Sequence, residues 1–143
     1  MGVINQLKWA WDSRGIVKSL LYKWRPRNCK NEKDHENSLS AFLRKKLPEI
    51  QITPQYARGR FRADLKIGKD IVIEIKHNLD STAKYERLLG QVVINSEWEG
   101  VIILLLVGNT NPNLKKQLIS DLKRLGLYNS WSASDDKVLV IEK

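Results

Sequence analysis

The chain has 143 residues, a length that fits one globular domain and leaves little room for a second. Hydrophobic residues make up 42% of it and charged residues 29%, which excludes a disordered or low-complexity chain. The formal net charge of +9 points to a polyanionic partner, either nucleic acid or an anionic membrane surface. One Cys and two His exclude a disulfide framework and a Cys/His structural zinc site, and they favour a reducing, cytoplasmic setting.

The positive charge is concentrated at the N-terminus. Residues 1–30 hold seven Lys and Arg residues against one acidic residue. Residues 3–24 have the apolar spacing of an amphipathic helix, with a break expected near Gly15. We therefore expect a basic helical extension at 1–30, followed by a domain at 31–143.

Aromatic residues lie among the cations of this extension. The tryptophans are Trp9, Trp11 and Trp24, and two neighbouring cations, Arg25 and Arg27, are candidate contacts to nucleic acid. Such a mixture suits stacking on bases or association with a membrane surface, and the same tryptophan spacing suits packing on the core. The three interpretations stay open at this point.

Eight further elements are predicted in chain order. They are helices at 34–47, 81–96 and 113–125, and strands at 50–57, 60–67, 70–77, 101–107 and 137–141. The strand at 101–107 is a continuous apolar run between glycines, which is typical of a strand buried on both faces. At seven residues it is far shorter than the roughly 20 of a membrane-spanning helix, so we expect no transmembrane segment. This order predicts an α/β (α+β) fold.

The hairpin formed by the second and third strands alternates charged with apolar residues. A three-residue turn at 68–70 would place Asp64 opposite Glu74 and Arg62 opposite Lys76, with all apolar side chains on one face. Glycine at the first turn position favours a two-residue turn instead, which would bury charge. Burying unpaired charge costs several kcal/mol, more than a turn preference is worth, so we expect the longer turn.

Two adjacent carboxylates repel each other, and a divalent cation that prefers oxygen ligands, Mg²⁺ or Mn²⁺, relieves that repulsion. Such an ion suits phosphodiester chemistry, in which the neighbouring ammonium of Lys76 could offset developing charge. Cations of the hairpin and of the following helix are candidate contacts to a phosphate backbone: Arg58, Arg60, Arg62 and Lys84. Without a metal, the same residues would form an exposed charged face with weak cross-strand ion pairs.

The residues of this pattern are Asp64, then after nine residues Glu74-Ile75-Lys76, with Glu36 on the preceding helix and Gln91 on the following one. The pattern resembles the PD-(D/E)XK nuclease superfamily, also called restriction-endonuclease-like, in its resolvase-like or RecB-type branch. The resemblance covers residues 34–107 and implies an αβββαβ core with a mixed central sheet flanked by helices. Two positions depart from it: Ala63 stands where the nominal motif has Pro, and Asn95 where the RecB-type pattern has Tyr.

The resemblance implies a metal site. Asp64, Glu74 and the backbone carbonyl of Ile75 would hold Mg²⁺ or Mn²⁺, and Glu36 would complete the acidic cluster. From its position alone, Glu36 equally fits a solvent-facing acid that is stabilised by the helix dipole.

The resemblance also implies an activity, that of a DNA endonuclease in which metal-activated water attacks directly, without a covalent intermediate. Lys76 would assist the water, and Gln91 looks like the glutamine of the RecB-type and resolvase-like branches. From helical spacing alone, Gln91 equally fits an ordinary polar surface residue. A homodimer is expected by analogy only. The alternative function is a non-catalytic nucleic-acid-binding module that keeps the nuclease fold.

Overall fold

The computed structural model describes residues 6–128 and 136–143, so the start of the first predicted helix, residues 3–5, lies outside the described residues. The elements are α1 (Gln6–Lys23), α2 (Glu32–Lys46), β1 (Ile52–Arg58), β2 (Phe61–Ile67), β3 (Ile71–His77), α3 (Thr82–Asn95), β4 (Val101–Val107), α4 (Pro112–Arg124) and β5 (Val138–Glu142). Every predicted element is present, and where both ends are described its limits agree with the prediction to within two residues.

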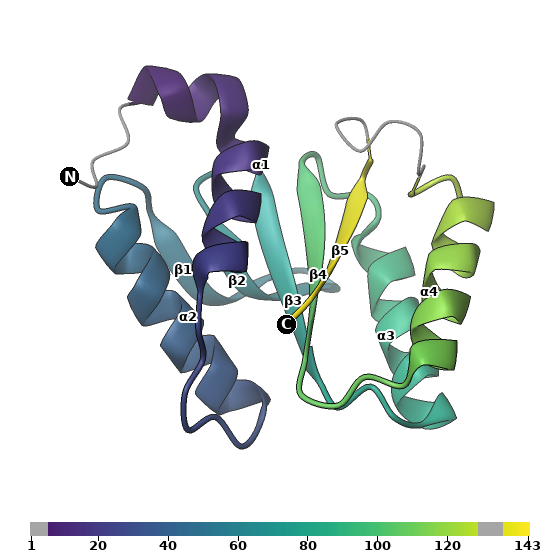
Figure 1. Cartoon of the computed structure of the whole chain (residues 1–143). Coiled ribbons are helices and arrows are strands. Elements are labelled where there is room, and N and C mark those ends of the chain that lie inside the picture. The colour runs from purple at the N-terminus through teal and green to yellow at the C-terminus, as the bar shows by residue number, and fades with distance from the viewer. Residues whose placement is uncertain (1–5, 129–135) are drawn as a thin grey trace.

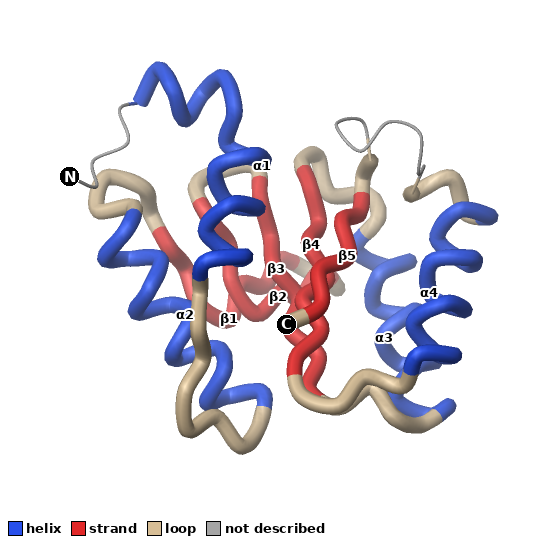
Figure 2. Tube along the Cα trace, in the orientation of Figure 1, coloured by secondary structure: helices blue, strands red, loops and turns tan. Residues whose placement is uncertain are grey.

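The strands form one mixed sheet in the order β1-β2-β3-β4-β5. β1, β2 and β3 are antiparallel neighbours, whereas β3, β4 and β5 run parallel. Helices α1 and α2 lie on one face of the sheet and α3 and α4 on the other (Figures 1 and 2). The described residues thus form the predicted mixed α/β fold, with four helices and five strands arranged in three layers.

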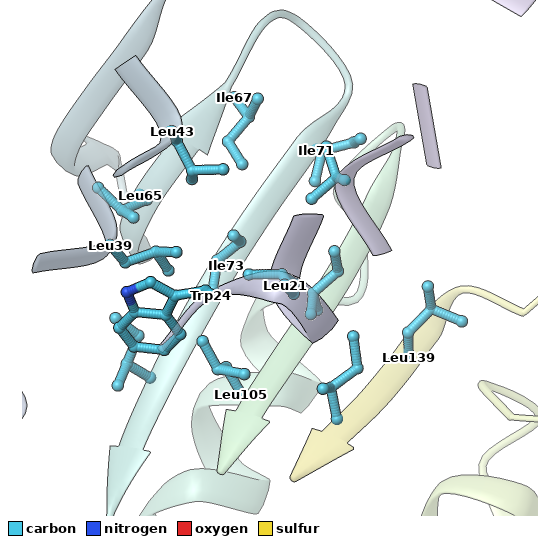
Figure 3. Close-up of a cluster of buried hydrophobic side chains, with 14 of the residues drawn as sticks. Leu21, Trp24, Leu39, Leu43, Leu65, Ile67, Ile71, Ile73, Leu105 and Leu139 are labelled. Atoms are coloured by element: carbon cyan, nitrogen blue, oxygen red, sulfur yellow. The ribbon is translucent and has the colours of Figure 1, made fainter. Parts of the chain in front are cut away.

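Alternation along the central strands divides the core into two clusters, one on each face of the sheet. All seven residues of β4 are buried, as the apolar run predicts. Leucine and isoleucine side chains of β2, β3 and β4 meet α1 and α2 around the buried Trp24 (Figure 3). On the other face of β3, Val72 is buried in the α3 and α4 cluster. The charged stretch of β3 therefore begins only at Glu74.

The N-terminal helix is part of this core. Val17, Leu21 and Trp24 are at most 1% exposed and belong to the cluster under α2. The partly buried Trp9 packs against the same cluster, so core packing is confirmed for two of the three tryptophans. Trp11, in contrast, is 84% exposed. The predicted break near Gly15 is present, three residues earlier in the chain. Non-helical backbone lies at Asp12 (φ −146°), whose carboxylate then accepts a hydrogen bond from the N–H of residue 15, like an N-cap.

Side-chain caps set where the helices that flank the site begin. Asn31 caps α2 by accepting a hydrogen bond from the backbone N–H of Asp34 at 2.8 Å. Ser81 caps α3 through the N–H of Lys84, at 3.3 Å. These caps fix the first turns of both helices next to the end of β3.

The turn between β2 and β3 is the longer one. Ile67 pairs with Ile71, which leaves residues 68–70 as the turn, and Gly68 has a left-handed φ of +63°. The expectation of a three-residue turn is confirmed, and the register that places Asp64 and Glu74 on neighbouring strands follows from it.

Candidate active site

Asp64 and Glu74 lie where β2 and β3 separate. Regular pairing between the strands ends at Leu65 and Ile73, one residue before this position. There the carboxylate Oδ2 of Asp64 accepts a hydrogen bond from the backbone N–H of Ile75 at 2.7 Å. A side chain thus takes over a strand N–H at the point where the sheet opens, and this bond fixes the Asp64 carboxylate beside β3.

The other neighbour of β2 is also interrupted at this level. β1 pairs with β2 through Pro54–Leu65 and Tyr56–Ala63, but Gln55, between them, has a left-handed φ of +49°. This conformation is rare for a residue with a side chain and costs on the order of 1–3 kcal/mol. Local strain of this kind persists only where the surroundings hold it in place.

The side chain of Gln55 supplies that hold. Its amide Nε2 donates to the Glu36 Oε2 at 2.8 Å, which joins β1 to α2 across 19 residues of sequence. A hydrogen bond from Gln55 also lowers the pKa of Asp64, so this amide serves both carboxylates. Sequence reasoning missed Gln55, because nothing in the strand pattern marks a left-handed residue that is not glycine or asparagine.

Glu36 is buried, with 3% of its surface exposed, so the solvent-facing interpretation of this residue is wrong. Its position on the buried stripe of α2, three residues before Leu39 and seven before Leu43, is the reason. Lys33 lies 3.6 Å from its Oε2. The other oxygen, Oε1, is buried and has no hydrogen-bond partner in the described part of the chain. A buried carboxylate oxygen without a partner is costly unless a cation or a proton meets it.

Glu32 joins the cluster from the preceding turn of α2. Its Oε1 accepts the backbone N–H of His77 at 3.1 Å and lies 3.3 Å from the Nζ of Lys76. The ion pair turns the ammonium of Lys76 toward α2. Sequence reasoning missed Glu32 as well, although its place four residues before Glu36 on one helix was a usable signal.

Burial and mutual repulsion shift the pKa values of the two strand carboxyls. Burial is the main cause for Glu74, followed by the charge of Asp64, and together they raise the pKa of Glu74 to about 9 against an opposing effect of Lys76. Burial is also the main cause for Asp64, whose pKa is raised to about 6 although the Ile75 hydrogen bond lowers it. The pair therefore carries less than its full negative charge at neutral pH.

Gln91 lies in a different environment from the carboxylates. Its Nε2 donates to the Oδ1 of Asn95 at 2.9 Å. Asn95 is buried, and it both donates to the backbone carbonyl of Arg62 and accepts from the Arg62 N–H. This pair of bonds fixes α3 to β2 two residues before Asp64. Gln91 thus contacts Asn95, the residue that holds α3 against β2, and not the carboxylates of Asp64 and Glu74.

The cations predicted to contact nucleic acid fall in three places. Arg58, Arg60 and Arg62 surround the β1–β2 turn, where Arg62 donates to two backbone carbonyls of that turn. Lys84, at the start of α3, pairs with Asp80 at 3.0 Å. The remaining two follow α1: Arg25 donates to the carbonyls of Tyr22 and Trp24, and Arg27 is exposed.

Within residues 6–128 and 136–143, no three His, Cys, Asp or Glu side chains are grouped in the way that would make a metal-binding cluster on their own. Asp64 and Glu74 form a pair, and Glu36 reaches them through Gln55. No helix in the described residues is long and apolar enough to cross a membrane. No family model, curated protein or solved structure matches this chain.

Proposed function

We propose that this protein is a metal-dependent DNA endonuclease with a restriction-endonuclease-like core, which hydrolyses phosphodiester bonds by metal-activated water. The observation that carries the proposal is the meeting of Asp64 and Glu74 where β2 and β3 separate, beside the buried carboxylate of Glu36. The element order from α2 to β4 supports it, because αβββαβ is the core order of the superfamily that the motif resembles.

The donor set suits a hard divalent cation such as Mg²⁺ or Mn²⁺. All candidate ligands are oxygens: the carboxylates of Asp64, Glu74 and Glu36 and, from the resemblance, the carbonyl of Ile75. The buried Oε1 of Glu36 has no partner among the described residues, as expected of a ligand oxygen. Bound there, the ion would polarise a phosphoryl oxygen and make a bound water more acidic.

The protein's own groups would then have separate tasks. Lys76 would orient the attacking water or offset the negative charge of the transition state. The neighbouring carboxylate of Glu32, 3.3 Å from the Lys76 Nζ, would hold the ammonium in place and limit its rotation. Gln55 would hold Glu36 and Asp64 in position through its amide.

The polyanionic substrate agrees with the charge of the protein. The chain carries +9 at neutral pH, and Arg58 and Arg60 project from the β1–β2 turn, at the end of the strand that carries Asp64. Exposed guanidinium groups near such a site would position a phosphate backbone without reading its sequence.

The test is cleavage of a labelled panel of single-stranded, duplex, flap and four-way-junction DNA in Mg²⁺, Mn²⁺ or EDTA. We expect cutting that requires the metal and is lost in Lys76→Ala, whereas Lys116→Ala, which removes an exposed cation on α4, cuts normally. Turnover retained in Asp64→Ala or Glu74→Ala would overturn the metal assignment. Binding without cutting under every metal would instead favour the non-catalytic nucleic-acid-binding module.

A further inference from the structure

A groove of about 610 Å³ lies between the β1–β2 turn and the C-terminal end of α3, outside the acidic site. Its walls include Val93 and Ile94 of α3, which are 47% and 37% exposed. These two neighbouring aliphatic side chains give the groove an exposed apolar wall.

The groove has a rigid aromatic floor. Phe61 and Trp98 lie with ring centroids 4.9 Å apart and an interplanar angle of 32°. Tyr56 packs edge-on against both rings, and the Trp98 indole N–H donates to the carbonyl of Asp70 at 3.0 Å. Trp98 is buried, whereas Phe61 stays partly exposed and is the ring available to a ligand.

Two guanidinium groups stand at the rim. Arg58 lies over the Trp98 ring, 5.8 Å from its centroid, and is exposed. Arg60 also lines the groove and, within the described residues, takes part in no hydrogen bond or ion pair. Among the described residues that line the groove, Glu97 is the one acidic residue, so they make the rim net positive. An apolar, aromatic groove with a cationic rim is complementary to an unpaired nucleic-acid strand, whose bases stack while its phosphates bind cations.

The groove lies close to the proposed catalytic site along a single strand. Phe61 precedes Asp64 by three residues on β2, which is about 10 Å at the rise of a strand. That distance spans about three nucleotides at the 3.4 Å rise of one strand in a duplex. The groove lies on the α3 face of the sheet and Glu36 on the α2 face, so a DNA strand with its phosphate at Asp64 would reach the groove by crossing β2 near Phe61.

We infer that this groove binds unpaired nucleotides next to the scissile phosphate, with a base on Phe61 between Val93 and Ile94 and phosphates on Arg58 and Arg60. The inference rests on the proposed function and names its substrate class: DNA with a single-stranded segment beside the cleavage point.

The experiment measures binding by fluorescence anisotropy in EDTA, so that no cleavage occurs. The full chain is titrated onto a blunt duplex and onto the same duplex with a four-nucleotide tail. We expect the tailed duplex to bind about tenfold more tightly, an advantage that Arg58→Ala/Arg60→Ala and Val93→Ser/Ile94→Ser each abolish. The matched control Lys116→Ala, which lies outside the groove, should bind both duplexes as the wild type does. No preference in the wild-type chain, or one that survives both double variants, would overturn the inference.

The two proposals fail separately. A tail preference without cleavage in Mg²⁺ would support nucleotide binding in the groove and refute the nuclease activity. Metal-dependent cleavage without a tail preference would support the nuclease activity and refute nucleotide binding in the groove. The groove could instead bind a second copy of the chain, and sedimentation of the free protein measures whether it forms a dimer. If Val93→Ser/Ile94→Ser converts a dimer to a monomer while the tail preference persists, the groove is a self-association surface and the inference is wrong.

Discussion

Replacement of Glu74 by glutamine should stabilise the metal-free protein at neutral pH. The pKa of Glu74 is raised from 4.5 to about 9, chiefly by burial and then by the charge of Asp64. The folded state therefore holds a proton that the unfolded chain releases between these two pH values. The contribution of this carboxyl to the free energy of unfolding is fully present below pH 4.5 and is lost as the pH rises toward 9.

The magnitude follows from the same shift. Each pH unit in this interval lowers the free energy of unfolding by about 1.4 kcal/mol, which gives an upper limit of about 3 kcal/mol at pH 7. Glu74 is only partly withdrawn from water, which reduces the expected gain to about 1–2 kcal/mol. Glutamine has nearly the same shape and never ionises, so Glu74→Gln should recover this amount.

Urea unfolding in EDTA at pH 5, 7 and 8.5 measures the effect. The wild-type free energy of unfolding should fall with pH, the Glu74→Gln profile should be flatter, and the two should differ most at pH 8.5. Glu86→Gln, an exposed glutamate of α3, is the matched control and should follow the wild type. Equal pH dependence in the wild type and Glu74→Gln would refute the argument that this carboxyl is protonated in the folded, metal-free protein.

Three further predictions concern the residues around this carboxyl. Mg²⁺ binding at pH 7 should release about one proton, because Glu74 must ionise to hold the ion. The binding enthalpy measured by calorimetry should then vary with the ionisation enthalpy of the buffer, and an enthalpy that is the same in every buffer would contradict the prediction. Asn95→Ala should lower the free energy of unfolding by about 2 kcal/mol, since it removes both bonds to Arg62, and a loss under 0.5 kcal/mol would contradict this. Gln55→Ala should destabilise the protein more than Gln55→Gly in thermal unfolding, because only glycine relieves the positive φ; the reverse order would mean that the backbone there is unstrained.

The elements of this fold were predictable because the signals that define them are local. Period-two alternation, helical apolar spacing and capping residues each act within a few positions of the chain, and the predicted limits agree with the structure to within two residues. Local physics also decided the turn at 68–70. Its three-residue form keeps Asp64 and Glu74 on the same side, and the cost of burying charge outweighs a turn preference.

Local signals were less informative about the N-terminal helix. The apolar stripe was visible, but only the structure shows that Trp24 is buried under α2 while Trp11 faces outward. The break lies at Asp12 because its carboxylate caps the next helical segment by accepting a hydrogen bond from the N–H of Gly15. This capping bond, and not the flexibility of Gly15, sets the position of the break.

The sequence by itself determined the order of elements, the turn that joins β2 to β3 and the two carboxylates on these neighbouring strands. Only the tertiary structure decided what surrounds them. Glu32 reaches β3 across 45 residues, Asn95 reaches β2 across 33, and Gln55 reaches Glu36 across 19. Such contacts exist only once helices and sheet have packed, and the strained backbone of Gln55 depends on that packing to be stable. Periodicity describes which face of an element is buried, but the partner of a polar group on that face is set by whichever distant segment packs against it.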